Sequence, residues 1–144
     1  MEIGFFQADN EDILPIFNLC KALIDEYEDH SSISYPKVLE WVETKIRQSI
    51  DTYTVVTLSG VKVGYYHLVK QGDKYELDDF YILPAYRRKG LGTYVLNAIC
   101  KKTEGSIFLY VFTQNTGAIA LYERFGFKWT KTVSPTRQIM ERPG

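Results

Sequence analysis

The first half of the chain contains two stretches in which apolar residues recur every three or four positions. The first runs from Ile13 to Tyr27 and follows acidic residues at 9–12, which suit a helix start. The second follows a polar loop over 28–35, and Pro36 fits its first turn because proline needs no N–H partner there. The spacing predicts two amphipathic helices with the apolar positions Ile13, Phe17, Cys20, Leu23, Ile24 and Tyr27, and Val38, Trp41, Val42, Ile46 and Ile50.

Shorter apolar and aromatic runs, separated by turn residues, predict strands in the rest of the chain. Ser59-Gly60 suits a hairpin turn, and Pro84 ends a strand because it cannot donate to a sheet ladder. The expected strands are 3–8, 52–59, 62–71, 75–83, 106–112, 127–133 and 136–142. The two further expected helices are one that opens after a glycine-rich turn, with Tyr94, Val95, Ala98 and Ile99 as apolar positions, and one over 116–125.

The predicted order is β-α-α-β-β-β-α-β-α-β-β, an α/β chain with a mixed sheet. Short turns make the three central strands an antiparallel meander, and an intervening helix makes the strands at 76 and 107 parallel. With 144 residues the chain has the length of one domain, so residues 1–144 are expected to form a single domain.

Composition limits the function classes. A net charge of −1 argues against an intrinsically basic nucleic-acid binder or a polybasic membrane protein. No apolar run is long enough to span a bilayer and no basic flank of a secretion signal is present, so a cytoplasmic protein is expected. Cys20 and Cys100 fall on apolar helix faces without histidine at ligand spacing, which indicates neither a disulfide nor a metal site.

The turn over residues 87–92 is the clearest candidate for chemistry, because three cationic residues precede a Gly-x-Gly at a helix start. Free N–H groups and a partial positive charge at that point favour an anion. Val95 takes the place of the third glycine in a Rossmann fingerprint, and Lys89 precedes Gly90 instead of following the last glycine as in a Walker loop. The turn therefore predicts an anion site of another kind.

Two motifs resemble the GCN5-related N-acetyltransferase (GNAT) family. Arg87-x-x-Gly90-x-Gly92 is similar to the family's pyrophosphate signature for acetyl-CoA, and Asn115-x-x-Ala118-x-x-Leu121-Tyr122-x-x-x-Gly126-Phe127 to its later motif. The resemblance implies helices on both faces of the sheet and two central parallel strands that splay apart around the pantetheine arm. It implies cofactor contacts at Phe80, Tyr81, Ile82, Arg87, Arg88, Lys89, Gly90, Leu91, Gly92, Thr93, Asn115, Ala118 and Tyr122.

The same resemblance implies a catalytic acid and a catalytic base. Tyr122 matches the family's general acid for the departing thiolate, and a phenol with a reference pKa of about 10 is protonated at neutral pH. Glu76 matches a glutamate that acts, often through water, in some members; Asp78, Asp79 or water alone remain alternatives. Strand alternation predicts one face with Glu76, Asp78 and Phe80 and the other with Asp79 and Tyr81.

The expected function is that of an acetyl-CoA-dependent N-acetyltransferase. It would acetylate a primary amine of a small molecule, peptide or protein by direct attack in a ternary complex, since both cysteines lie outside the motifs. The alternatives are a non-catalytic acyl-CoA-binding sensor or interaction module, and a nucleotide-binding fold of another kind. Acids at 26–29 suit either a cationic acceptor or a solvated helix end. His30 and His67 belong to no motif and are expected to be structural, and a homodimer is compatible with the sequence.

Overall fold

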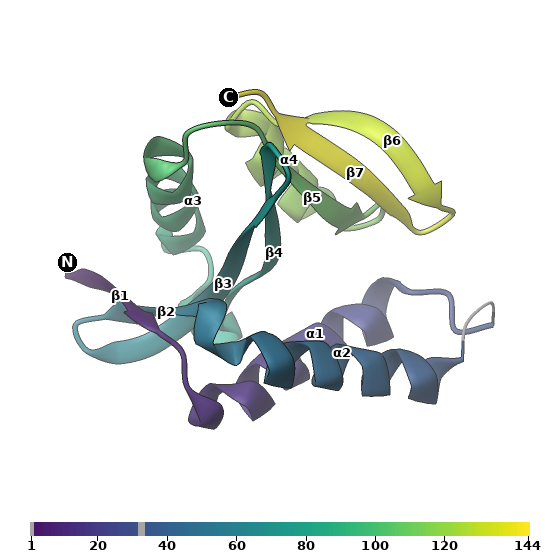
Figure 1. Cartoon of the computed structure of the whole chain (residues 1–144), viewed down its shortest axis with the longest axis horizontal. Helices are drawn as coiled ribbons and strands as arrows, with labels where there is room; N and C mark the ends of the chain where they lie inside the picture. Colours follow the sequence, from purple (N-terminus) through teal and green to yellow (C-terminus); the bar gives the residue numbers. More distant parts are fainter. Residues whose placement is uncertain (1, 32–33) are drawn as a thin grey trace.

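A mixed sheet of seven strands organises the computed structural model, which describes residues 2–31 and 34–144 (Figure 1). The strand order is β1-β2-β3-β4-β5-β7-β6. The strands are β1 (Ile3–Gln7), β2 (Tyr53–Leu58), β3 (Val61–Gln71), β4 (Lys74–Ile82), β5 (Ile107–Phe112), β6 (Lys128–Ser134) and β7 (Arg137–Arg142). The helices are α1 (Ile13–Tyr27), α2 (Tyr35–Ser49), α3 (Leu91–Lys102) and α4 (Thr116–Arg124), with short 3₁₀ turns η1 (Asn10–Asp12), η2 (Ile50–Thr52) and η3 (Pro84–Tyr86).

The predicted order of helices and strands is confirmed. The loop expected over 28–35 is shorter, because α2 already begins at Tyr35, and residues 32–33 of that loop lie outside the described residues. Ser59 and Gly60 have φ angles of 49° and 84°, the two positive values that a type I′ hairpin turn requires. None of the described helices is long and apolar enough to cross a bilayer.

Two aromatic residues that the spacing assigned to buried helix faces are exposed: Trp41 by 65% and Tyr94 by 50%. In α2 the buried positions are Val42 and Ile46, so Trp41 lies beside the buried stripe and not within it. The buried face of α3 consists of Leu91, Val95, Leu96, Ile99 and Cys100. The predictions for Trp41 and Tyr94 were wrong because each lies next to the stripe, where apolar spacing alone does not fix the direction of a side chain.

Each face of the sheet has its own hydrophobic core. Helices α1 and α2 pack with Val55 and Tyr65 on one face, whereas α3 and α4 pack with Val56 and Val63 on the other (Figure 1). Successive residues of a strand point to opposite faces, which explains why Val55 and Val56 belong to different cores. The sheet is therefore covered on both sides, as the family resemblance implied.

Strands β4 and β5 are paired over a short length only. The parallel register joins Tyr75 with Ile107 and Glu76 with Phe108, and the two strands then continue to Ile82 and Phe112 without pairing. Figure 1 shows the two strands diverging from this point. The expected splay is present, and one side of the β4 backbone lacks a strand partner beyond Glu76.

A bulge interrupts β4 directly after the splay begins. On β3, Tyr65 pairs with Tyr81 and His67 with Asp78, so β4 carries one more residue than β3 over this interval. Asp79 occupies the bulge with a φ of 48°, a left-handed conformation that aspartate tolerates better than most residues. The simple alternation of side chains along β4 is lost at this position.

Gly64 of β3 lies beside this bulge, where the sheet leaves no room for a side chain. An added Cβ would lie 2.4 Å from the carbonyl oxygen of Tyr81 and 2.9 Å from Cδ1 of Ile82. Gly64→Ala should therefore separate β3 from β4 and lower the free energy of unfolding by about 1–3 kcal/mol, measured by urea denaturation. Gly117→Ala in α4, where an added Cβ meets no atom within 4 Å, is the control and should not be destabilising. Equal urea midpoints for Gly64→Ala and the unmodified protein would contradict the prediction.

Candidate active site

A cavity of about 720 Å³ opens where β4 and β5 part. Helices α1 and α2 form one wall, β3 and β4 the centre, and β5 and α4 the other wall. The structure brings these predicted residues to the cavity: Glu76, Asp78, Asp79, Phe80, Tyr81, Asn115, Ala118 and Tyr122.

Tyr122 points from α4 into this cavity and packs against Phe127, with 5.6 Å between the ring centroids. None of the described residues hydrogen-bonds its hydroxyl, and none of their buried side-chain polar atoms lacks a partner, so the hydroxyl must be open to the cavity. Burial and, to a smaller degree, the charge of Asp78 raise the pKa of Tyr122 well above its ordinary value. The phenol is therefore protonated and available as a proton donor.

Glu76 occupies the last paired position of β4 and β5 and lines the cavity. Gln71 donates a long hydrogen bond of 3.4 Å from Nε2 to the Glu76 carboxylate. Burial and the negative charge of Asp78 raise the pKa of Glu76 above its ordinary range. A raised pKa makes this carboxylate a stronger base.

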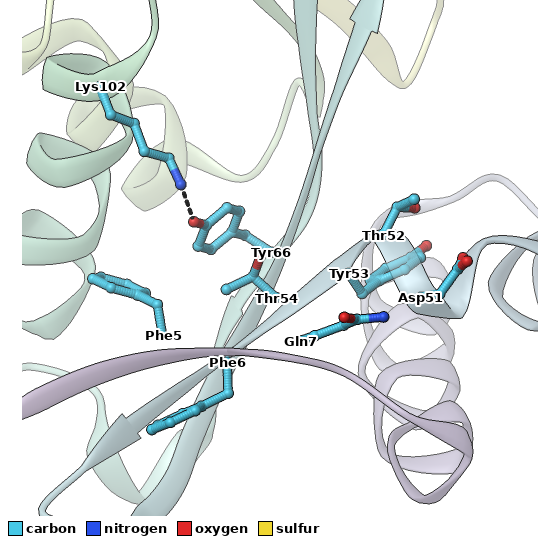
Figure 2. Close-up of a pocket in the computed structure, with 9 residues that line it drawn as sticks. All are labelled: Phe5, Phe6, Gln7, Asp51, Thr52, Tyr53, Thr54, Tyr66 and Lys102. Atoms are coloured by element: carbon cyan, nitrogen blue, oxygen red, sulfur yellow. Dashed lines mark hydrogen bonds between the residues drawn. The ribbon is translucent and has the colours of Figure 1, made fainter.

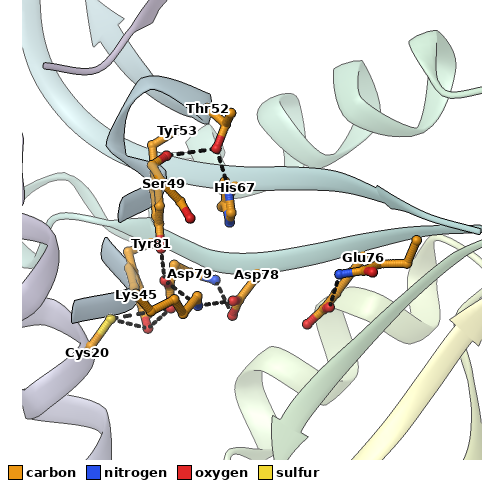
Figure 3. A network of polar contacts seen from close by, with 11 residues as sticks. Cys20, Lys45, Ser49, Thr52, Tyr53, His67, Glu76, Asp78, Asp79 and Tyr81 are labelled. Atoms are coloured by element: carbon orange, nitrogen blue, oxygen red, sulfur yellow. Dashed lines mark hydrogen bonds and ion pairs between the residues drawn. The ribbon is translucent and has the colours of Figure 1, made fainter. Parts of the chain in front are cut away.

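Asp79 is the centre of a buried polar network (Figure 3). Its carboxylate accepts hydrogen bonds from the hydroxyl of Tyr53 at 2.6 Å, the hydroxyl of Tyr81 at 3.1 Å and the thiol of Cys20 at 3.3 Å, and Lys45 Nζ lies 3.1 Å away. Burial alone would raise the pKa of Asp79, but Lys45 and these hydrogen bonds outweigh it and hold the pKa below its ordinary range. Asp79 is the least suited of the candidate bases, because its acceptor sites are already occupied.

Asp78 shares Lys45 with Asp79, and it accepts a hydrogen bond of 2.9 Å from the backbone N–H of Asp79. The prediction that these two carboxylates face opposite sides of the sheet was wrong, because the bulge at Asp79 turns both toward Lys45 (Figure 3). Burial, and then the nearby Asp79, raise the pKa of Asp78. Asp78 is the less constrained member of the pair.

The two cysteines do not offer a nucleophile. Burial raises the pKa of Cys20 far above its ordinary value, and the charge of Asp79 adds to the effect, so the thiol is not ionised. Cys100 is buried in the core on the opposite face of the sheet, where burial also raises its pKa.

The basic turn joins β4 to α3. Gly90, with a φ of 80°, is the N-cap residue of α3 and offers no side chain, so the helix start has no side-chain cap. Arg88 also has a positive φ, 63°, which is uncommon for a residue with a side chain. Both left-handed residues lie directly before the helix start, where N–H groups without an intrahelical partner favour an anion. Arg87 is partly used within the protein, because its Nε donates to the carbonyl of Ile82 at 2.8 Å and braces the turn.

Two further predicted positions have structural partners. The Oδ1 of Asn115 accepts a hydrogen bond of 3.3 Å from the N–H of Ala118, so Asn115 caps α4 while it lines the cavity. Gly92 lies against α4, where an added Cβ would be 3.6 Å from Cδ2 of Leu121, an ordinary contact, so the packing of α3 on α4 does not itself require a glycine there.

The far side of the cavity is bridged between α1 and the turn before β7. The hydroxyl of Thr136 donates to the carboxylate of Glu28 at 2.5 Å, and Tyr27 stacks on Phe112 at 5.8 Å between ring centroids. Glu28 also lines the cavity, and it is one of the acids at 26–29 that the sequence analysis related to a possible cationic acceptor. His30 does not line it, and its Nε2 lies 3.1 Å from the carbonyl of Ile24.

Sequence reasoning missed Lys45, which holds two of the strand carboxylates. A signal was present, because Lys45 is a lone cation between Val42 and Ile46 on the buried side of α2. Arg137 was missed as well: its guanidinium lies 5.0 Å from the ring centroid of Tyr110 at the edge of the cavity. No sequence pattern points to that contact.

A second cavity of about 330 Å³ lies between β1, β2 and α3 (Figure 2). Lys102 crosses it and donates a hydrogen bond of 2.6 Å to the hydroxyl of Tyr66. None of the predicted site residues lines this second cavity. Within residues 2–31 and 34–144, no group of His, Cys, Asp and Glu is arranged to hold a metal ion.

Comparison with known proteins finds curated proteins that are similar to this chain in sequence. An uncharacterized protein of Mycobacterium leprae is 30% identical over an alignment of 130 residues, and the match covers 84% of this chain and 36% of that protein. A spermine/spermidine N(1)-acetyltransferase of Bacillus subtilis is 40% identical over an alignment of 62 residues, and the match covers 37% of this chain and 38% of that enzyme. The chain thus spans little more than a third of the length of these curated relatives.

Among solved structures, the PaiA N-acetyltransferase of Thermoplasma acidophilum, determined in complex with coenzyme A, has a TM-score of 0.73 at 22% identity, with 100% of both chains covered. This likeness supports the fold. Residues 16–127 match the sequence family described as "Acetyltransferase (GNAT) family". This range spans both motifs and the opening between β4 and β5. The chain belongs to the GNAT acetyltransferase family.

Proposed function

We propose that this protein transfers an acetyl group from acetyl-CoA to a primary amine, by direct attack in a ternary complex. The observation that carries the proposal is the cavity at the opening between β4 and β5, which is lined by both Tyr122, with its free hydroxyl, and Glu76.

The residues at the opening fit acetyl-CoA. The uncapped start of α3, with left-handed Arg88 and Gly90, suits a pyrophosphate, and Arg87, Arg88 and Lys89 supply positive charge there. The edge of β4 at Phe80, Tyr81 and Ile82 lacks a strand partner and offers backbone groups to an amide-containing arm such as pantetheine, apart from the Ile82 carbonyl that already accepts from Arg87. Bound there, acetyl-CoA would supply an acyl carbon that an amine can attack.

Glu76 and Tyr122 would divide the proton transfers. Glu76, whose pKa is raised by burial, would take a proton from the incoming ammonium directly or through water. Tyr122, which is protonated at neutral pH, would donate its proton to the leaving sulfur and regain one from the attacking nitrogen, which loses its second proton as the amide forms. A covalent intermediate is not part of the proposal, because the Cys20 thiol is un-ionised, with a pKa raised by burial, and donates a hydrogen bond to Asp79.

The lining charges favour a cationic acceptor. Four carboxylates face the cavity against two cationic side chains: Glu28, Glu76, Asp78 and Asp79 against Lys45 and Arg137. An acidic wall attracts an amine that carries further positive charge. The matched enzyme of Bacillus subtilis is named for spermine and spermidine, which are molecules of this kind. A polyamine is therefore the first acceptor to test.

The test is CoA thiol release with purified protein, acetyl-CoA and a panel of polyamines, monoamines, amino acids and peptides with free N-termini or lysines. Turnover that is fastest with polyamines is expected. The alternative function, a non-catalytic acyl-CoA-binding module, would gain support if acetyl-CoA raised the melting temperature but no amine released thiol. A rise in melting temperature with NAD or ATP but not with CoA would contradict both the acetyltransferase and the acyl-CoA-binding function.

Tyr122→Phe should lower kcat by about 10²-fold or more and leave the Kd for acetyl-CoA nearly unchanged, because the variant removes the proton donor but keeps the ring that packs on Phe127. Assays of CoA thiol release measure kcat, and calorimetric titration measures the Kd for acetyl-CoA. Tyr110→Phe, which removes a hydroxyl from another cavity-lining tyrosine, is the matched control and should retain activity. Unchanged kcat in Tyr122→Phe would remove Tyr122 as the acid.

Glu76→Gln should lower kcat/KM and change its dependence on pH. In the unmodified protein the base must be ionised, so kcat/KM should fall as pH drops through the raised pKa of Glu76, at higher pH than for an ordinary carboxyl group. The acid limb caused by this group should be absent in Glu76→Gln. An identical acid limb in both proteins would assign the titration to another group, with Asp78 next to be tested.

A further inference from the structure

His67 is a buried residue of β3 that lines the cavity, and no motif or proposed step has given it a role. Its Nε2 lies 2.7 Å from Oγ1 of Thr52, and the same hydroxyl lies 2.7 Å from the carbonyl oxygen of Ser49. A carbonyl oxygen can only accept, so the single proton of the Thr52 hydroxyl is donated to Ser49. Nε2 of His67 must then donate to Thr52, which leaves Nδ1 as the unprotonated nitrogen with a free lone pair.

The free nitrogen faces the cavity. Nδ1 makes no hydrogen bond with the described residues, yet none of their buried side-chain nitrogens lacks a partner, so Nδ1 must be reachable from the space that His67 lines. Figure 3 shows the second ring nitrogen pointing away from Thr52, toward the side of Asp78 and Asp79. The register also pairs His67 with Asp78 across the two strands.

The surroundings fix both the orientation and the charge of the ring. Tyr53 stacks on it with 4.0 Å between centroids and 3° between planes, which prevents the ring from tilting. Burial and then the charge of Lys45 lower the pKa of His67 to about 4, with Asp79 opposing. The imidazole is therefore neutral at physiological pH and cannot become a donor at Nδ1 by taking up a proton.

We propose that Nδ1 of His67 accepts a hydrogen bond from the amino group of the acceptor and orients it for attack. The inference rests on the proposed function, since it concerns the amine of that reaction. A deprotonated amine has N–H groups and one lone pair, so holding an N–H at Nδ1 restricts the directions that the lone pair can take. Thr52 is the positioning residue, because its bond to Nε2 selects the tautomer.

Matched variants separate this role from a structural one. His67→Gln places an amide near Nε2, which can still bond to Thr52, but removes the acceptor at Nδ1. His67→Asn places its carbonyl oxygen near Nδ1. We expect kcat/KM for the best amine of the panel to fall about tenfold in His67→Gln and less in His67→Asn, with an unchanged KM for acetyl-CoA. Equal losses in both variants, or a loss that follows the KM for acetyl-CoA, would overturn the inference.

Thr52 gives a test that leaves the histidine in place. Thr52→Val removes the partner of Nε2 and allows the ring to adopt the other tautomer, so kcat/KM for the amine should fall several-fold, as expected for one lost hydrogen bond. Thr52→Ser keeps the hydroxyl, so its kcat/KM for the amine should be close to that of the unmodified protein. Failure of Thr52→Ser to differ from Thr52→Val would contradict the tautomer argument.

The tautomer can also be read without turnover. Long-range ¹H–¹⁵N spectra of the histidine rings in ¹⁵N-labelled protein should show Nδ1 of His67 unprotonated and Nε2 protonated. In the presence of CoA, 1,4-diaminobutane should shift the Nδ1 resonance of the unmodified protein, and His67→Gln assigns the signal. A protonated Nδ1, or no shift at saturating amine, would overturn the inference even if thiol release is observed. Absence of thiol release with every amine would instead refute the proposed function.

Discussion

The interrupted pairing between β4 and β5 is the constraint on which the rest of the structure depends. Two strands that keep the parallel ladder at Tyr75 and Glu76, but lose it afterwards, leave a gap in an otherwise continuous sheet. The backbone groups along that gap need partners, because buried amides are rarely left unsatisfied. The cavity, the exposed edge of β4 and the position of α4 all follow from this one departure from regular pairing.

The bulge at Asp79 gives the gap its chemistry. A regular strand would send Asp78 and Asp79 to opposite faces, whereas the left-handed residue sends both to Lys45. Such a buried cluster is stable only when each charge is matched and hydrogen-bonded. Tyr53, Tyr81 and Cys20 complete the matching for Asp79, and this leaves Glu76 and Asp78 as the carboxylates with capacity for a substrate.

The sequence predicted the order of the elements, because apolar spacing and turn residues are local signals. Through the family resemblance that two specific motifs carry, it also predicted the splay and eight of the residues that line the cavity. The faces of β4 were predicted wrongly, since a bulge depends on register with β3 and leaves no mark in alternation. Lys45 and the tautomer of His67 were not foreseen for a related reason: both depend on contacts between residues far apart in the chain, as Lys45–Asp78 and Tyr53–His67 show.

The bridge between Glu28 and Thr136 has a mechanical consequence. The helices α1 and α2 belong to one core and β5 and α4 line the opposite wall, and the sheet joins the two sides by only two paired positions between β4 and β5. Beyond those pairs, the Glu28–Thr136 hydrogen bond and the Tyr27–Phe112 stack connect the end of α1 with β5 and with the turn before β7. An acceptor that enters from that side must therefore pass beside these two contacts or separate them.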